Sequence, residues 1–323
     1  TLSVLTKIVI YIYCKMPKIS YIIPCYYNEE NIPVTKKSLI ENEKLFDTNT
    51  EFEYVFVDDG SKDNTYNELL KFKREYQKKV KLIKLSGNFG SHNAVLAGMS
   101  HASGDCCVVL AADLQDPLDL IPKMFNHWLK GIKLVIANRD SREDPFFKKI
   151  FANFFHFLIR KIALPNLPRG GFDLVLFDKK LNQKIVEMNE RNTHQLFLLT
   201  TLNYDYVNIA YKRLNREIGK STWTFSKRVK LFIDSFVSFS YFPLRFISFL
   251  GFFLGLVSIV YASFLIYNKL IGKIPIDGWT TNVVILLFVS SFQMISLGVL
   301  GEYTWRTLDA SRNRPNYVVE EIQ

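Results

Sequence analysis

The chain has 323 residues, of which 48% are hydrophobic and 15% aromatic, and its formal net charge is +10. This length can hold one good-sized α/β domain with an accessory part, and the apolar fraction argues against a purely soluble protein. The excess of cations is compatible with binding to nucleic acid, to a membrane surface or to an anionic small substrate. The apolar segments show which of these partners is favoured.

The first fifteen residues, TLSVLTKIVIYIYCK, contain an apolar run that is too short to span a bilayer and no small-residue cleavage site. We therefore expect neither a signal peptide nor an anchor here, treat 1–17 as an N-terminal extension and regard Met16 as a natural start. The cysteines have no metal or redox spacing, which fits a reducing compartment and small buried side chains. They are Cys14, Cys25, Cys106 and Cys107.

Short β-rich runs alternate with helical stretches between residues 18 and 215. Strands are expected at 18–24, 52–61, 80–86, 105–113 and 133–139. Helices are expected at 34–46, 64–77, 94–102 and 118–130. This rhythm predicts a parallel, doubly wound sheet, and in such sheets ligands bind at the carboxyl ends of the strands.

Polar clusters follow four of these strands: PCYYNEE, VDDGSKDNT, SGNFGSHN and ADLQD. Taken singly, the last cluster is explained by a polar turn, because Asp116 and Pro117 make a good N-cap and first-turn pair. Asp63 is likewise explained as a helix cap. Capping explains Asp58 poorly, because a carboxylate at a strand end usually has a ligand or partner. The convergence of four clusters favours a ligand site.

Acidic groups from two strand ends would repel a phosphate ligand unless a divalent cation lay between them. Asp113 and Gln115 offer hard oxygen ligands, which suit Mg²⁺ or Mn²⁺ with substrate phosphates completing the shell. The chain contains no GxxxxGK[ST] loop, so a P-loop NTPase is unsupported.

Two uncharged segments, 246–267 and 280–301, lie near the C-terminus. The first would span roughly 33 Å as a helix, which is enough for a bilayer core. The alternative is a pair of buried helices in a soluble core. The short link 268–279 makes the pair a hairpin. More cations flank the pair than lie in the link, so the positive-inside rule places the N-terminal part in the cytoplasm. The flanking cations are Arg228, Lys230, Arg245, Arg306, Arg312 and Arg314.

Two further segments, 144–162 and 226–245, have apolar residues along one helical side and cations elsewhere, as interfacial helices do. The alternative is that both pack against the sheet. The sequence thus predicts a catalytic domain at 18–225, a juxtamembrane helix at 226–245, a transmembrane hairpin at 246–303 and a cytoplasmic tail at 304–323.

The strings IPCYYNEENIP, VDDGSKDNT, NFGSHNAVLAGM, ADLQDP, GGFD and REIGKSTW resemble the inverting GT-A glycosyltransferases of family 2. They are most similar to the polyprenyl-phosphate group, the bactoprenol glucosyltransferases and dolichyl-phosphate mannose synthases. The resemblance runs from about Lys18 to the C-terminus. It implies a GT-A Rossmann-like domain with a mostly parallel sheet, a UDP-sugar donor, and undecaprenyl phosphate or a similar polyprenyl phosphate as acceptor. Glucose is the first choice of sugar, with N-acetylglucosamine and galactose as alternatives, because the sequence shows no sugar-specific contact. A flippase in the same pathway and a second copy of the chain are further expected partners.

The resemblance also assigns roles to single residues. Pro24, Tyr26, Asn28 and Glu29 would line the nucleoside pocket, with the doubled tyrosine leaving the register open by one residue. Asp58 and Asp59 would contact the base and ribose, and Asn88 belongs to the same pocket. Asp113 and Gln115 would hold the metal against the diphosphate. Arg139 would meet a phosphate, and the cations near the acceptor phosphate would be Arg213, Arg216 and Lys220. These last three have a plainer interpretation as contacts to the lipid surface. Asp173 in GGFD would act as a general base, or would hold a sugar hydroxyl or a neighbouring backbone group.

Two departures from the family pattern keep other functions open. Ala111 stands where the family commonly has the first Asp of Asp-x-Asp, and Gly87 stands where an Arg often precedes NFG. A non-catalytic subunit that binds nucleotide sugar is therefore one alternative. A processive polysaccharide synthase is another, disfavoured by only two spans and by the lack of a QxxRW-like string. Nucleic-acid binding is disfavoured, because the cations concentrate around the lipid-facing segments.

Overall fold

The computed structural model describes residues 16–47, 49–139, 157, 159–168, 172–190, 193–211, 234, 236–271 and 278–323. The chain divides into two compact units. One consists of Thr1–Phe225 together with Pro315–Gln323, and the other of Ser226–Arg314. The last nine residues therefore belong to the same unit as the N-terminal domain.

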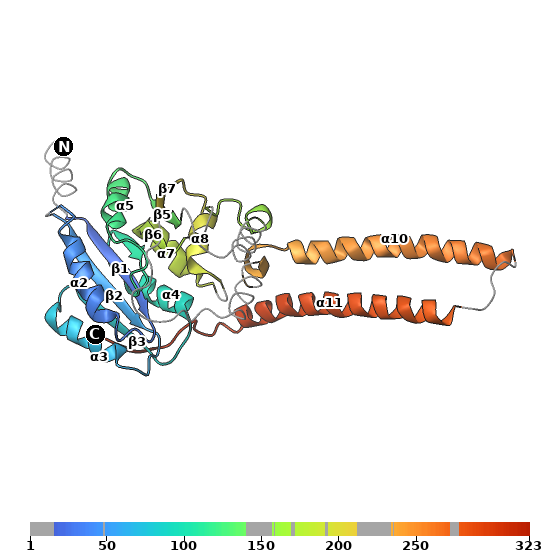
Figure 1. Ribbon diagram of the computed structural model, residues 1–323, viewed down its shortest axis with the longest axis horizontal. Helices are drawn as coiled ribbons and strands as arrows, with labels where there is room; N and C mark the ends of the chain where they lie inside the picture. Colours follow the sequence, from blue (N-terminus) through green and yellow to red (C-terminus); the bar gives the residue numbers. More distant parts are fainter. Residues whose placement is uncertain are drawn as a thin grey trace, which may run out of the picture. The chain divides into compact units, whose positions relative to one another are not determined.

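The first unit is built around an eight-stranded sheet in the order β7-β5-β6-β4-β1-β2-β3-β8 (Figure 1). The strands are β1 (Lys18–Cys25), β2 (Glu51–Asp58), β3 (Val80–Leu85), β4 (Cys106–Val109), β5 (Leu134–Arg139), β6 (Leu174–Asp178), β7 (Tyr206–Tyr211) and β8 (Val319–Ile322). The neighbours β4, β1, β2 and β3 run parallel, as do β5 and β7. β6 is antiparallel to β4 and β5, and β8 is antiparallel to β3. The mostly parallel sheet that was expected is confirmed.

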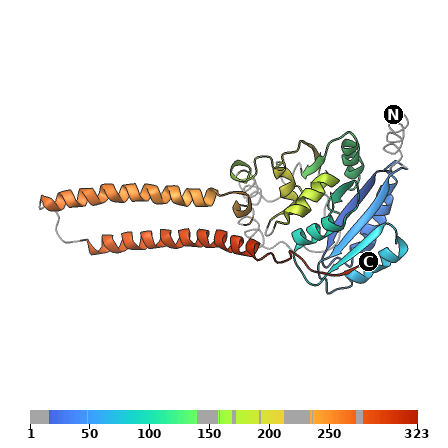
Figure 2. The same ribbon diagram turned by 180° about the vertical axis from the view of Figure 1, so that it is seen from behind.

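Helices cover both faces of the sheet (Figures 1 and 2). The helices α2 (Ile32–Glu43), α3 (Thr65–Glu75) and α5 (Leu120–Leu129) bury apolar side chains in one large cluster on one face. On the other face α4 (Ser91–His101) packs against the sheet and against α7 (Lys179–Met188) and α8 (Gln195–Thr201). The apolar strands are thus buried from both sides, as parallel sheets require.

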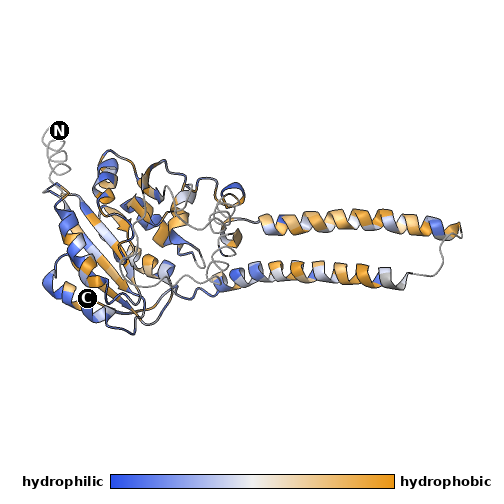
Figure 3. Ribbon diagram, viewed as in Figure 1, coloured by the Kyte–Doolittle hydropathy of each residue, from blue (hydrophilic) through white to orange (hydrophobic). Residues whose placement is uncertain are grey.

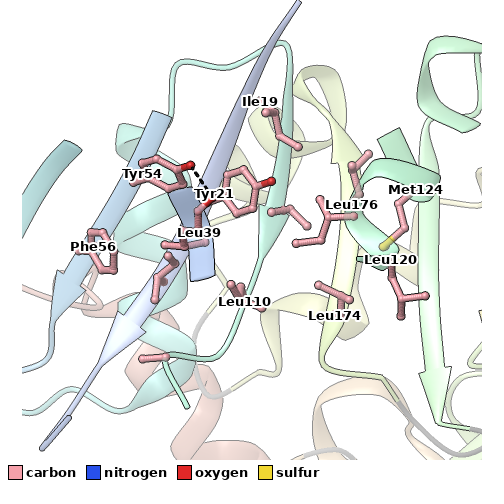
Figure 4. Close-up of a cluster of buried hydrophobic side chains, with 14 of the residues drawn as sticks. Ile19, Tyr21, Leu39, Tyr54, Phe56, Leu110, Leu120, Met124, Leu174 and Leu176 are labelled. Carbon is pink, nitrogen blue, oxygen red and sulfur yellow. Dashed lines mark hydrogen bonds between the residues drawn. The ribbon is translucent and has the colours of Figure 1, made fainter. Parts of the chain in front are cut away.

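The large cluster contains the aromatic side chains of Tyr21, Tyr54 and Phe56 among aliphatic ones (Figure 4). The rings of Tyr21 and Tyr54 lie 5.2 Å apart and are both fully buried. Their hydroxyl groups still have partners, because Tyr21 donates to Asn42 Oδ1 at 3.1 Å and Tyr54 to Glu43 Oε1 at 2.9 Å. Both acceptors lie in α2 or at its end, so these bonds fix α2 over the sheet without leaving a buried polar atom unpaired.

The second unit contains two long helices, α10 (Phe242–Leu270) and α11 (Trp279–Ser311). Phe242–Asn268 and Thr281–Ser311 are long and apolar enough to cross a membrane (Figure 3). The most apolar window of each is not buried inside the described structure. The expected spans, 246–267 and 280–301, lie within α10 and α11. Of the two expected interfacial helices, 144–156 and 226–233 lie outside the described residues. Arg306 of α11 pairs with Asp234 at 2.6 Å and with Glu302 at 3.0 Å, which ties the segment before α10 to the end of α11.

Candidate active site

The carboxyl ends of β4, β1, β2 and β3 lie along one edge of the sheet. Cys25 is in register with Asp58, and Asp58 is in register with Lys84. The polar segments that follow these strands therefore meet at this edge, as the sequence predicted.

Asp58 ends β2 and is fully buried. Its Oδ1 accepts the backbone N–H of Ser61 at 3.3 Å. Its Oδ2 is buried and has no hydrogen-bond partner within the described part of the chain. Burial raises the pKa of this carboxyl, which the bonds from Ser61 partly oppose. An unpaired buried carboxylate oxygen is costly, so its place at a strand end indicates a ligand that donates a hydrogen bond.

Asp59 is also buried, but both of its carboxylate oxygens are already used. Oδ1 accepts the N–H of Phe89 at 2.7 Å, and Oδ2 accepts the N–H of Gly90 at 2.9 Å. Burial raises the pKa of Asp59 to about 6. In this arrangement Asp59 holds the loop between β3 and α4, which carries the exposed Asn88.

The segment after β1 is an ordered turn. Asn28 Oδ1 accepts the N–H of Tyr26 at 2.8 Å, and Glu29 Oε2 accepts the N–H of Asn64 at 2.8 Å. These two side chains therefore shape the loops. The rings of Tyr26 and Tyr27 remain exposed and pack edge to face with centroids 4.6 Å apart. Pro24, within β1, is partly buried.

Tyr27 has φ +53°, a conformation that residues with a side chain seldom adopt, and its N–H donates to Ser61 Oγ at 3.2 Å. The backbone N–H of Asn28 donates to Thr65 Oγ1 at 2.8 Å. Ser61 and Thr65 were not among the site residues expected from the sequence, although both belong to the polar VDDGSKDNT cluster that pointed to this edge.

The loop after β4 carries the two proposed metal ligands. Asp113 and Gln115 are both partly exposed, and the N–H of Gln115 donates to Asp113 Oδ1 at 3.4 Å. Leu114 between them has φ +50°. From α2, Thr35 Oγ1 donates to the carbonyl of Ala112 at 2.8 Å, which fixes the start of the loop.

Asp116 is not exposed at the site. It is 1% exposed, and the hydroxyl of Tyr211 in β7 donates to its Oδ1. The capping function considered for Asp116 is not observed, because α5 begins at Leu120 with Asp119 as its N-cap residue. Asp116 instead ties the loop to the far strand of the sheet.

Asp173 reaches the same edge because β6 is antiparallel. Val109 pairs with Val175, so the residues that follow β4 lie beside those that precede β6. Asp173 is half-buried there. Arg139 ends β5 at this edge too, although its side chain, like Arg213, Arg216 and Lys220, lies outside what the structure describes.

Two histidines that the sequence analysis passed over lie together. The ring of His92, in the first turn of α4, is 4.1 Å from that of His194, which stacks on Phe197 at 4.0 Å. Burial and the nearby His92 hold the pKa of His194 well below its usual value. No signal in the sequence pairs two histidines a hundred residues apart.

The donor set at the Ala112–Asp116 loop fits a hard divalent cation. Asp113 contributes a carboxylate and Gln115 an amide oxygen, both accessible from solvent. Among the described residues no group of three or more His, Cys, Asp or Glu side chains is placed to hold a metal ion. Most ligands would therefore be phosphate oxygens and water, as is usual for Mg²⁺ in nucleotide sites.

The sequence pattern of the family described as Glycosyl transferase family 2 matches residues 20–186, more than half of the chain. The chain belongs to this family. It is therefore a glycosyltransferase, its mostly parallel sheet is the GT-A-like fold, and the resemblance drawn from its motifs is confirmed.

The chain is similar to curated relatives along nearly its whole length. The bactoprenol glucosyl transferase of Shigella phage SfV is 33% identical over 304 residues, which are 94% of this chain and 98% of the relative. A prophage bactoprenol glucosyl transferase homolog of Escherichia coli (strain K12) is 32% identical over 95% of this chain and 99% of the relative. A solved mannosyltransferase from Pyrobaculum calidifontis, in complex with GDP-Man and Mn²⁺, is 16% identical and covers 93% of this chain and 88% of its own, with a TM-score of 0.48.

Proposed function

We propose that this enzyme transfers one glucose from UDP-glucose to a polyprenyl phosphate, undecaprenyl phosphate, with inversion at the anomeric carbon. The observation that carries the proposal is the likeness to bactoprenol glucosyl transferases over nearly the full length of both chains, including the two long apolar helices. The match to the family pattern alone covers residues 20–186 and does not include these helices.

Asp58 supports a nucleotide donor. Its unpaired Oδ2 would accept the imino N–H of uracil, and the exposed rings of Tyr26 and Tyr27 offer a stacking surface at the same edge. Guanine also presents N–H donors, so the test must compare both bases. Asp59 would act indirectly by holding the loop that includes Asn88.

Asp113 and Gln115 would hold Mg²⁺ or Mn²⁺ at the diphosphate. When bound, such an ion neutralises charge on the leaving UDP. Asp113 supplies the negative charge that attracts the ion, while Gln115 supplies a neutral oxygen and leaves the net charge of the site low. Ala111 stays neutral and partly exposed beside them.

The acceptor brings its own nucleophile. A phosphate monoester has a second pKa of about 6, so near neutral pH it is largely a dianion. One of its oxygens forms a bond to the anomeric carbon while the bond from that carbon to the UDP oxygen breaks, and no proton has to be removed. The enzyme must then relieve charge repulsion, a role we assign to Arg139, Arg213, Arg216 and Lys220.

The cation asymmetry around α10 and α11 supports a catalytic domain on the cytoplasmic face of the inner membrane. In sealed inside-out vesicles, protease should cleave the domain before residue 226 and spare 268–279. Cleavage confined to 268–279 would contradict this orientation. The product would then need a flippase to reach the opposite face.

The function is tested with purified protein, polyprenyl phosphate, Mn²⁺ and a panel of UDP- and GDP-linked sugars, with the lipid product weighed by mass spectrometry. We expect a mass gain of one hexose from UDP-glucose. Longer products would indicate a processive synthase. Nucleotide binding without any glycolipid would favour a non-catalytic subunit.

A further inference from the structure

The C-terminal tail, Pro315–Gln323, returns to the catalytic unit after α11 and becomes its last strand. The N–H of Leu82 donates to the carbonyl of Gln323 at 2.9 Å, and the N–H of Gln323 donates to the carbonyl of Leu82 at 2.8 Å. The N–H of Ser86 donates to the carbonyl of Val318 at 3.0 Å. This last bond lies where β3 ends and the loop held by Asp59 begins.

A β-bulge in the tail aims an acidic side chain at β3. Ile322 pairs with Ile83 and Glu321 with Lys84, but Val319 pairs with Leu85, so Glu320 is the extra residue. Its carboxylate lies 3.0 Å from Lys84 Nζ. Bulges of this kind redirect side chains and are frequent beside active sites.

Lys84 links the tail to the buried carboxylate of the site. It is in register with Asp58 on the neighbouring strand, and its Nζ lies 5.2 Å from the centroid of the Tyr66 ring. The Tyr66 hydroxyl in turn donates to Glu321 at 2.7 Å. Burial raises the pKa of Asp58, and the positive charge of Lys84 opposes that shift. Glu320 thus pairs with Lys84, whose charge acts on Asp58, and Glu321 holds the Tyr66 ring that Lys84 faces.

The apolar side of the tail packs with the same loop. Tyr317 and Val319 pack against a small buried cluster made of β2, β3 and α4 side chains, and so does Phe89. Phe89 is the residue whose N–H binds Asp59. The tail and the β3–α4 loop therefore pack against the same apolar cluster.

The start of the tail holds a third segment. Asn316 Nδ2 donates to the carbonyl and to Oδ1 of Asn189, at 3.2 and 2.8 Å, in the turn after α7. The Tyr317 hydroxyl donates to Ser100 Oγ of α4 at 3.0 Å. The far end of the α7–α8 connection carries His194, which contacts His92 at the start of α4.

We propose that the tail positions the donor site: Glu320 through Lys84, and Asn316 through Asn189 at the end of α7, which packs on α4, keep the β3–α4 loop in the conformation that binds nucleotide sugar. The inference rests on the proposed nucleotide-sugar donor. If the tail only covered the sheet edge, it would protect against aggregation and add stability, and substitutions in it would leave the donor affinity unchanged. If the tail positions the donor site, substitutions in it change the affinity for the donor and leave the affinity for the lipid unchanged.

The test uses the full-length protein in detergent or nanodiscs with the variants Glu320→Gln and Asn316→Ala. The readouts are the dissociation constant of UDP with Mn²⁺, the KM of UDP-glucose and of polyprenyl phosphate, kcat, and the thermal midpoint without ligand. We expect the dissociation constant of UDP to rise about threefold or more in each variant, with the lipid KM, kcat and midpoint unchanged. Glu187→Gln and Asn126→Ala, at exposed positions on α7 and α5, are the matched controls.

Combining Lys84→Met with Glu320→Gln distinguishes an effect of Glu320 on the donor site through Lys84 from a general loss of structure. If Glu320 acts through Lys84, the double variant binds UDP no more weakly than the Lys84→Met variant alone. Additive losses, or a lower thermal midpoint with unchanged UDP affinity, would overturn the inference and leave the tail as an edge cover. Wild-type protein that binds neither UDP nor GDP would overturn the proposed function and this inference together. Wild-type binding with unaffected variants overturns the inference alone.

Discussion

Gly60 and Gly87 approach so closely that a methyl group on Gly60 would lie 2.5 Å from the carbonyl carbon of Gly87. The contact joins the turn after β2 to the loop after β3. Gly60 also has φ +70°, which favours glycine. The two segments that carry Asp58, Asp59 and Asn88 thus meet through this backbone contact as well as through the bonds from Phe89 and Gly90 to the Asp59 carboxylate.

The first prediction follows from this contact. Gly60→Ala should lower the free energy of unfolding by roughly 2–4 kcal/mol, because it adds both a disfavoured φ and a clash with backbone. Thermal unfolding in detergent measures the loss. Gly87→Ala is the control, since a methyl group there meets nothing within 4 Å and the change should be nearly neutral. Equal stability of the two variants would show that the two loops do not meet in this way.

A second prediction uses the space at Gly87. An Arg often stands at this position in the family that the motifs resemble, and a Cβ added at Gly87 would meet nothing within 4 Å. Gly87→Arg should tighten UDP binding by about threefold to tenfold, because it adds a cation beside the diphosphate. Gly87→Gln separates charge from size. If both variants bind UDP equally tightly, the charge is not the cause.

The third prediction concerns pH and Asp59, whose pKa burial raises to about 6. Below this pH the carboxyl gains a proton and loses one of its two bonds to the N–H groups of Phe89 and Gly90. The affinity for UDP-glucose should therefore fall as the pH drops below about 6. UDP-glucose is the suitable probe, because its diphosphate does not titrate there. In Asp59→Asn the decline should disappear, and a persistent decline would assign it to another group.

The raised pKa of Asp59 also affects stability, but in the opposite direction: the affinity for UDP-glucose rises with pH, whereas the free energy of unfolding falls. The folded protein binds this proton more tightly than the unfolded chain does, so ionisation of Asp59 lowers the free energy of unfolding as the pH rises from about 4 to about 6. The difference in thermal midpoint between wild type and Asp59→Asn, both without ligand, should follow that window.

The parallel half of the fold was predictable because its signals are local. The strand that contains Tyr54 and Phe56 has a continuous apolar run at 54–57, and Asp58 follows where this run stops. Five strands and four helices were expected within a few residues of where they lie, except that β4 ends four residues earlier, at Val109. Parallel pairing then required their carboxyl ends to share an edge, so the meeting of the polar segments at that edge followed as well.

The remaining elements depend on contacts between distant segments. β6 and β8 contain only five and four residues, and nothing local to Leu174 or Val319 states which strand each will join or in which direction. Roles at the site show the same limit. Asn28, Glu29 and Asp59 lie at the expected edge of the sheet, but their side chains bind backbone N–H groups, which no motif reveals.

A fourth prediction tests the metal ligands. Asp113→Asn should lower kcat/KM by at least about 100-fold, because an amide cannot replace the charge of a carboxylate on a divalent cation. A chelator should have the same effect on wild type, and Mn²⁺ should restore that activity. Asp119→Asn, at the exposed start of α5, removes the same charge nearby and should be active. Full activity of Asp113→Asn would place the metal elsewhere.

The last prediction is that Asp173 is not an obligatory base. It lies at the site edge because β6 is antiparallel to β4, so its position alone would suit a base. The acceptor, however, is a phosphate whose second pKa of about 6 leaves it ionised near neutral pH. A hydroxyl nucleophile would have to lose a proton during attack, and a phosphate dianion does not. The rate should then rise with pH through one step near the pKa of the lipid phosphate and stay level above it. Asp173→Asn should keep a measurable fraction of kcat, with its main effect on the KM of the sugar donor. If Asp173→Asn abolished turnover while UDP-glucose and lipid still bound normally, Asp173 would be the base and the acceptor phosphate would not supply the charge for attack.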